Sequence, residues 1–236
     1  MFSLSKKVID SKSPFSRLFS KVAVVLSGCG VYDGSEIQEA VSTLIHLSKN
    51  GAEYQCFAPN KEQMHVIDHL KTEPTKESRN VLTESARIVR GDIKPLNDIN
   101  IKEMDAIIFP GGFGAAKNLS DFATKGKDFV VDTEVEKILK EFHKQKKPIG
   151  LICIAPVLGA KVFKDCIVTI GDDPGVKDVI QSVGARHKDL DPEEICVDDK
   201  NLIISTPAYM KAQKINVVFD GIGKLVKKVL EFTEKK

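Results

Sequence analysis

The chain has 236 residues, of which 42% are hydrophobic and 29% are charged, which is an ordinary composition for a globular protein of one large domain or two small ones. This composition excludes a mainly disordered chain and a fibre, and no apolar run reaches the roughly 18 residues that a membrane-spanning helix needs. The 35 basic and 33 acidic side chains leave a net charge of +2, too small for a nucleic-acid-binding surface. We therefore expect neither a nucleic-acid partner nor a membrane partner.

The first 21 residues differ from the rest of the chain. They contain six serines and an apolar face formed by Phe15, Leu18 and Phe19. Basic, serine-rich and amphipathic segments are typical of organelle transit peptides. Residues 1–21 are thus predicted to be a mitochondrial transit segment. The alternative is a disordered tail of a cytoplasmic protein. Residues 22–236 are predicted to form a single domain. The charged residues of the segment are Lys6, Lys7, Asp10, Lys12, Arg17 and Lys21.

The chain then alternates between predicted strands and helices. The apolar run Lys21–Ser27, which ends in Gly28-Cys29-Gly30, predicts a buried strand. Ser35 is a candidate cap for a helix that ends near Gly51, and Tyr54–Ala58 is the next predicted strand. The apolar positions of that helix are Ile37, Ala40, Val41, Leu44, Ile45 and Leu47.

The same alternation continues to the C-terminus and predicts a mostly parallel sheet with helices on both faces. Ligands bind beyond the carboxyl ends of the strands in such sheets. We therefore expect the three strand ends 28–35, 110–114 and 153–156 to converge on one crevice. The later strands are predicted at 106–109, 148–152, 167–170 and 202–205, and the later helices at 81–89, 130–143, 156–163, 176–183 and 215–232.

Cys153 is the strongest candidate for a catalytic residue. It follows a predicted strand and precedes Pro156, a residue favoured in the first turn of a helix. A nucleophile at a sharp strand-to-helix turn is a nucleophile elbow, here with sulfur in place of oxygen. The helix N-terminus beside it would favour the thiolate. A buried cysteine with a purely structural role fits this segment equally well.

Two further elements lie at the predicted strand ends. Gly111 and Gly112 can bring backbone N–H groups close to a substrate and direct them at an oxyanion. Glu36, at the start of the first helix, is the candidate acid or base beside the thiol, with Glu39 as the less favoured substitute. Ordinary turn glycines and a helix N-terminal acid are the simpler interpretations.

The remaining cysteines and histidines give weaker signals. Five cysteines without a CxxC pair predict neither a disulfide framework nor a structural zinc site, so we expect no bound metal. Cys29 could face the same crevice as Cys153, and a regulatory disulfide between them is a hypothesis. His187 could also approach the crevice.

Several long motifs, in order from about Lys21 to the C-terminus, resemble one family. They are Ser27–Ile37, Arg79–Leu82, Ala86–Ile88, Arg90-Gly91, Pro110–Leu119, Cys153–Pro156 and Thr206–Met210. With these motifs the chain resembles the ElbB (enhancing lycopene biosynthesis) / ES-one family, within the PfpI-like class I glutamine amidotransferase-like superfamily. The resemblance implies a flavodoxin-like three-layer sandwich, with Cys153 as the nucleophile. It also implies a mitochondrial location, because eukaryotic members with an N-terminal extension are typically mitochondrial.

The resemblance further implies a cofactor-independent glyoxalase activity. Amidotransferase and peptidase relatives need a catalytic histidine, and the peptidases place it directly after the cysteine. This chain has Ile154 at that position, so we expect neither glutaminase nor peptidase activity. The expected reaction converts methylglyoxal or glyoxal to the 2-hydroxy acid. Cys153 would add to the aldehyde, Glu36 would move the proton, and N–H groups near Gly112 and Ile154 would stabilise the oxyanion.

Other outcomes remain open at this stage. Removal of a glyoxal adduct from a protein or nucleotide would use the same steps. The alternative to an enzyme is a mitochondrial thiol redox sensor or metabolite-binding protein, because an exposed thiolate is prone to oxidation. Superfamily relatives often dimerise, so a homodimer is a further expectation.

Overall fold

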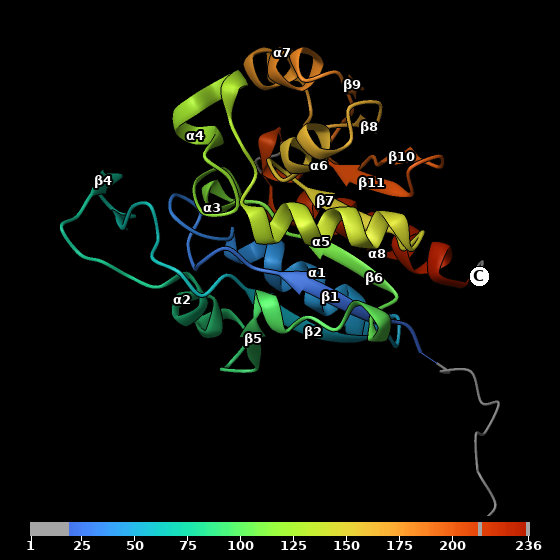
Figure 1. Ribbon diagram of the computed structural model, residues 1–236, viewed down its shortest axis with the longest axis horizontal. Coiled ribbons are helices and arrows are strands. Elements are labelled where there is room, and N and C mark those ends of the chain that lie inside the picture. The colour runs from blue at the N-terminus through green and yellow to red at the C-terminus, as the bar shows by residue number, and fades with distance from the viewer. Residues whose placement is uncertain (1–18, 212–213, 235–236) are drawn as a thin grey trace, which may run out of the picture.

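A seven-stranded sheet forms the centre of the computed structural model, which describes residues 19–211 and 214–234 (Figure 1). The strand order is β10-β11-β7-β6-β1-β2-β5, and every neighbouring pair is parallel except β10 and β11. The strands of this sheet are β1 (Lys21–Val25), β2 (Glu53–Ala58), β5 (Ile93–Pro95), β6 (Ala106–Phe109), β7 (Ile149–Ile152), β10 (Cys196–Asp198) and β11 (Ile203–Thr206). The predicted transit segment lies outside the described residues except for its last three, and Lys21 is already part of β1.

Helices cover both faces of the sheet, as the sequence predicts. Helices α1 and α8 pack together on one face, and α5 and α6 lie on the other, with α5 crossing in front of the sheet in Figure 1. The flavodoxin-like three-layer α/β sandwich is thereby confirmed. The helices are α1 (Ile37–Lys49), α2 (Val81–Ile88), α3 (Phe113–Lys117), α4 (Phe122–Lys125), α5 (Thr133–Lys144), α6 (Pro156–Val162), α7 (Pro174–Ser182) and α8 (Ile215–Glu234).

Alternating side chains of the central strands fill two separate hydrophobic cores. In β1, Ala23 and Val25 point to the α5 and α6 side, whereas Val22 and Val24 point to the α1 and α8 side. This follows from the period of two along a strand. Because both faces are covered, β1 is apolar at nearly every position, which is why an unbroken apolar run predicted it correctly.

The chain order creates a crevice between β1 and β6. From β1 the chain moves outward through β2 to β5, and it then returns to β6 and continues outward the other way through β7 and β11. In such open sheets the reversal of strand order leaves a crevice at the carboxyl ends of the two strands, and ligands bind there. The loops after β1, β6 and β7 do converge: the Glu36 N–H donates to the Gly111 carbonyl at 2.9 Å, and Gly111 packs against Cys153.

Three details differ from the sequence prediction. Ser35 does not cap α1, because its hydroxyl accepts a hydrogen bond from the Ser27 N–H at 2.8 Å, and Glu36 is the N-cap instead. Residues 167–170 contain only β8 (Ile167–Val168), which pairs with β9 (Arg186–His187) outside the main sheet. Ile37, Val41 and Ile45 are each at least 37% exposed, so only part of the apolar pattern of α1 faces the core.

A long insertion between β2 and α2 extends from one end of the sheet and contains the hairpin of β3 (Ile67–Asp68) and β4 (Glu73–Pro74) (Figure 1). Asn118, which is 1% exposed, attaches this insertion to the crevice loops. Its amide nitrogen donates to the carbonyls of Ser27 and Asp33, both at 2.8 Å. Its amide oxygen accepts from the Met64 N–H at 3.0 Å. One side chain thus fixes three segments that are far apart in sequence.

No described helix is both long enough and apolar enough to cross a membrane.

Replacing Asn118 with leucine should destabilise the fold by at least about 2 kcal/mol, because two buried carbonyls and one N–H lose their partners while the volume is kept. Urea denaturation of both proteins measures this difference. Asn60→Leu is the control, since Asn60 is exposed and accepts one hydrogen bond from Asn80, at 2.9 Å. Equal losses in the two variants would contradict the role assigned to Asn118.

Candidate functional site

Cys153 occupies a strained turn between β7 and α6. Its φ angle is +61°, in the left-handed region that non-glycine residues rarely adopt, and its N–H donates to the Thr206 carbonyl at 3.0 Å. This is the backbone of a nucleophile elbow, which directs the side chain into the crevice. The thiol also accepts hydrogen bonds from the N–H groups of Gly112 and Ile154. The side chain is 7% exposed.

A fully buried carboxyl group, that of Glu39 in the first turn of α1, contacts the thiol. It forms a hydrogen bond with Cys153, and its Oε2 accepts from the Gly111 N–H at 2.9 Å. Its Oε1 accepts from the Tyr209 N–H at 3.3 Å. Glu39 therefore bonds to residues that follow β6, β7 and β11, and it is held in one position.

The environment of this pair opposes negative charge. Burial, and then the charge of Glu36, raise the pKa of Glu39 from 4.5 to about 8. Burial and the charge of Glu39 raise the pKa of Cys153 well above its ordinary value, although the Gly112 and Ile154 N–H groups act in the opposite direction. Glu39 thus keeps its proton at neutral pH. A protonated Glu39 can donate to a thiolate, which would then accept three hydrogen bonds.

Glu36, the acid favoured from sequence, occupies a different place. It is the N-cap of α1, and its Oε2 accepts from the Glu39 N–H at 2.6 Å. The side chain lines the cavity around Cys153, and burial raises its pKa. The carboxyl group that bonds to the thiol is that of Glu39, because a capping side chain folds back onto its own helix whereas Glu39 points from the first turn beneath Gly111.

The glycine loop contributes in two ways. The N–H of Gly111 is already bonded to Glu39, so it is not available to an oxyanion as the sequence had suggested. The N–H groups of Gly112 and Ile154 do point at the sulfur and are available to a bound substrate. A Cβ on Gly111 would lie 2.4 Å from the Cys153 Cβ and 2.7 Å from Glu39 Oε2. Only glycine allows this close approach.

The two accessory residues suggested by the sequence lie outside this cavity. Cys29 is half-buried, and the charged groups that affect its pKa include Arg87 and Glu84 on α2. His187 is buried in β9, where its Nε2 accepts from the Ile170 N–H at 3.1 Å and its Nδ1 lies 3.1 Å from Asp189 Oδ1. Burial lowers its pKa, which suits a neutral structural histidine. All five cysteines are free.

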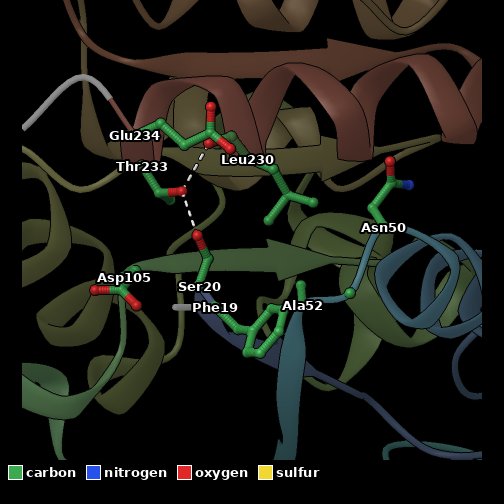
Figure 2. Close-up of a pocket in the computed structure, with 9 residues that line it drawn as sticks. Phe19, Ser20, Asn50, Ala52, Asp105, Leu230, Thr233 and Glu234 are labelled. Carbon is green, nitrogen blue, oxygen red and sulfur yellow. Dashed lines mark hydrogen bonds between the residues drawn. The ribbon is translucent and has the colours of Figure 1, made fainter. Parts of the chain in front are cut away.

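Another cavity, of about 370 Å³, lies at the opposite end of the sheet (Figure 2). It surrounds the start of β1, where the Ser20 and Thr233 hydroxyls are hydrogen-bonded at 2.6 Å and the Phe19 ring lies below Ala52 (Figure 2). This is the amino end of the parallel strands, where this type of fold does not bind its ligands. Its lining contains no cysteine or histidine, so we assign it no chemistry. In the described part of the chain, no cluster of three or more histidine, cysteine or acidic side chains could hold a metal ion.

An α/β sandwich with a cysteine at the sharp turn between a central strand and the following helix defines the class of protein, one that presents a thiol at a nucleophile elbow. A model of the DJ-1/PfpI family matches residues 21–213, and the chain belongs to that family. The coarser part of the resemblance drawn from the sequence is confirmed by this match, whereas assignment to the ElbB group stays a prediction.

Individual relatives agree with this placement. The chain is 54% identical over 240 residues to the rat "ES1 protein homolog, mitochondrial", which covers 98% of this chain and 90% of the relative. It is 54% identical over 226 residues to the human "Glutamine amidotransferase-like class 1 domain-containing protein 3, mitochondrial", covering 92% of this chain and 84% of the relative. A crystal structure of an isoprenoid biosynthesis protein with an amidotransferase-like domain from Ehrlichia chaffeensis superimposes with a TM-score of 0.85 at 38% identity, covering 90% and 99% of the two chains.

The buried carboxyl group makes stability depend on pH in a defined direction. Between pH 4.5 and about pH 8 the unfolded chain has lost the Glu39 proton while the native protein retains it, so wild-type stability falls as pH rises through this window. Glu39→Gln removes this titration, and its stability relative to wild type should increase from about pH 5 to about pH 8, by up to a few kcal/mol.

Urea denaturation at both pH values measures this change, and Glu134→Gln, at the exposed start of α5, is the control. A difference between Glu39→Gln and wild type that stays constant with pH would show that Glu39 is ionised in the native protein at neutral pH.

Proposed function

We propose that this protein is a cofactor-independent glyoxalase-type enzyme that converts a 2-oxoaldehyde, such as methylglyoxal or glyoxal, into the 2-hydroxy acid. The hydrogen bond between Cys153 and the buried Glu39 carboxyl is the observation that supports it. The reaction needs a nucleophile that holds the aldehyde carbon and an acid–base group that moves a proton between two neighbouring carbons. Cys153 lines the cavity, and the buried Glu39 carboxyl lies beside its thiol.

The first steps use the thiolate form of the pair. The sulfur adds to the aldehyde carbon, and the resulting oxyanion takes the Glu39 proton to give a hemithioacetal. The Gly112 and Ile154 N–H groups, which bond to the sulfur in the free site, are placed to stabilise the oxyanion as it forms. Such donors contribute about 3–4 kcal/mol each in other enzymes.

The later steps use the Glu39 carboxylate. It removes the hydrogen from the former aldehyde carbon, giving an enediolate, and returns that proton to the neighbouring carbon. The hydroxyl proton of the first carbon passes to the oxygen of the second. The first carbon becomes a thioester and the second an alcohol, so one is oxidised and the other reduced by the same electron pair. Water then hydrolyses the thioester, which releases the 2-hydroxy acid and restores the Cys153 thiol. Release of a glyoxal adduct from a protein or nucleotide would follow the same sequence.

The site is less suited to the alternative of a redox sensor. Sensor cysteines combine a low pKa with solvent exposure. Cys153 is 7% exposed, and burial raises its pKa. These properties support a thiol that ionises when a substrate is bound rather than one that reacts with any oxidant.

We also place the protein in the mitochondrion. The rat and human relatives at 54% identity are both named mitochondrial. The basic, serine-rich composition of residues 1–21 supports the same location. A homodimer stays a prediction.

The direct test is lactate production from methylglyoxal in the absence of glutathione. Cys153→Ala should abolish it, and Glu39→Gln should lower kcat by at least about a hundredfold, because the proton transfer loses its carrier. Loss of methylglyoxal without lactate would indicate simple scavenging by amines and thiols. Lactate production by folded Cys153→Ala would contradict the proposal.

Glu36→Gln should act on the pH profile instead. The charge of Glu36 helps to raise the pKa of Glu39, so its removal should move the rise of kcat/KM with pH to a lower pH, with a smaller loss of kcat than in Glu39→Gln. Rates measured from about pH 6 to about pH 9 test this. If Glu36→Gln lost more activity than Glu39→Gln, Glu36 would be the proton carrier.

A further inference from the structure

The cavity above Cys153 is larger than small 2-oxoaldehydes require. Its volume is about 300 Å³. Water occupies about 30 Å³ per molecule in the liquid, so this space holds a ligand of roughly ten non-hydrogen atoms. Methylglyoxal would fill only the part next to the thiol and leave the rest to water.

Most of the side chains that line the cavity are apolar. Its walls carry Phe113 of α3, Phe122 of α4, Val176 of α7 and Met210, which precedes α8. Water bonds poorly to such a surface, and an apolar substituent that replaces it gains the free energy of burial.

The charged groups at the cavity are acidic. Glu36 and Asp173 line it, and none of its described lining residues is a lysine, arginine or histidine. Two nearby lysines have other partners. The Lys117 amine donates to the Tyr32 carbonyl at 2.8 Å, and the Lys211 amine lies 2.9 Å from both Asp172 and Asp191. A carboxylate or phosphate on the substrate would thus meet acids and find no cation among the residues described as lining the cavity.

We propose that the substrates are uncharged 2-oxoaldehydes with an apolar alkyl or aryl substituent, in preference to methylglyoxal and to anionic 2-oxoaldehydes. This inference rests on the proposed function. The carbonyl carbons lie at Cys153, beside which Glu39 is buried, and the substituent extends along Phe113, Phe122 and Met210. The chemistry is that described above, and the substituent takes no part in it.

An alkyl series tests the preference without changing the carbonyl chemistry. We expect kcat/KM for hexylglyoxal to exceed that for methylglyoxal at least about tenfold, and a glyoxal with a propionate substituent to be the poorest of the three. Equal values for hexylglyoxal and methylglyoxal, or a preference for the propionate compound, would overturn the inference.

A pair of neighbouring variants locates the apolar wall. Ala123 lines the cavity from α4, whereas the adjacent Thr124 is exposed and is not part of the lining. Ala123→Leu should reduce the ratio of hexylglyoxal to methylglyoxal kcat/KM severalfold by taking up space, and Thr124→Leu should leave the ratio unchanged. The same ratio in both variants would contradict the placement of the substituent.

Alkylation of Cys153 gives a readout that does not depend on turnover. Relative to free cysteine, we expect N-hexyl iodoacetamide to label Cys153 faster than iodoacetamide, and iodoacetate to label it slowest, as followed by mass spectrometry. If no aldehyde is turned over but this order holds, the glyoxalase proposal fails while the ligand class is supported. If iodoacetate labels as fast as iodoacetamide, the ligand class is wrong whatever the turnover.

Discussion

The candidate site depends on one buried carboxyl group. Glu39 joins α1 to the segments that follow three parallel strands, through the Gly111 N–H, the Tyr209 N–H and the Cys153 thiol. A carboxylate in such a position would be costly, so the group retains its proton to a pKa of about 8. The same burial that destabilises its charge gives it a basicity close to that of a catalytic base working near neutral pH. Stability and reactivity are therefore set by the same contacts.

The close contacts of the backbone make this arrangement possible. Gly111 approaches Cys153 so closely that any Cβ would overlap it, and Cys153 adopts a left-handed backbone conformation. Both features cost conformational freedom or strain, and the hydrogen bonds of the surrounding loops compensate for them. Asn118 closes this frame from the other side by holding the loop after β1 against the insertion. The site is thus built on the segments that directly follow the central strands, and hydrogen bonds between these segments hold it together.

The sequence predicted the five central strands β1, β2, β6, β7 and β11, together with the elbow, because each depends on local pattern, whereas the short edge strands β5 and β10 were missed. The run before Cys153 and the proline after it define a strand-to-helix turn whatever surrounds them. The choice between Glu36 and Glu39 depends instead on where α1 begins and how it rotates against the sheet. The exposed Ile37, Val41 and Ile45 gave α1 a second apolar stripe, so periodicity did not show that Glu39 lies on the buried side. Glu39 lies four residues before Thr43, so the two side chains fall on the same side of α1, and the structure shows both to be buried. This spacing identifies the buried side only when the tertiary contacts of Thr43 are known.

The acidic surroundings of the cavity have a consequence for the lifetime of the free thiol. Glu36 and Asp173 line the same cavity as Cys153. The common low-molecular-weight thiols and disulfides of the cell, glutathione above all, carry net negative charge. Mixed-disulfide formation needs such a molecule to reach the sulfur and a thiolate to attack it. We expect both conditions to be met poorly here, so that the cysteine stays reduced, and open to its substrate, in a compartment where exposed thiolates are soon capped.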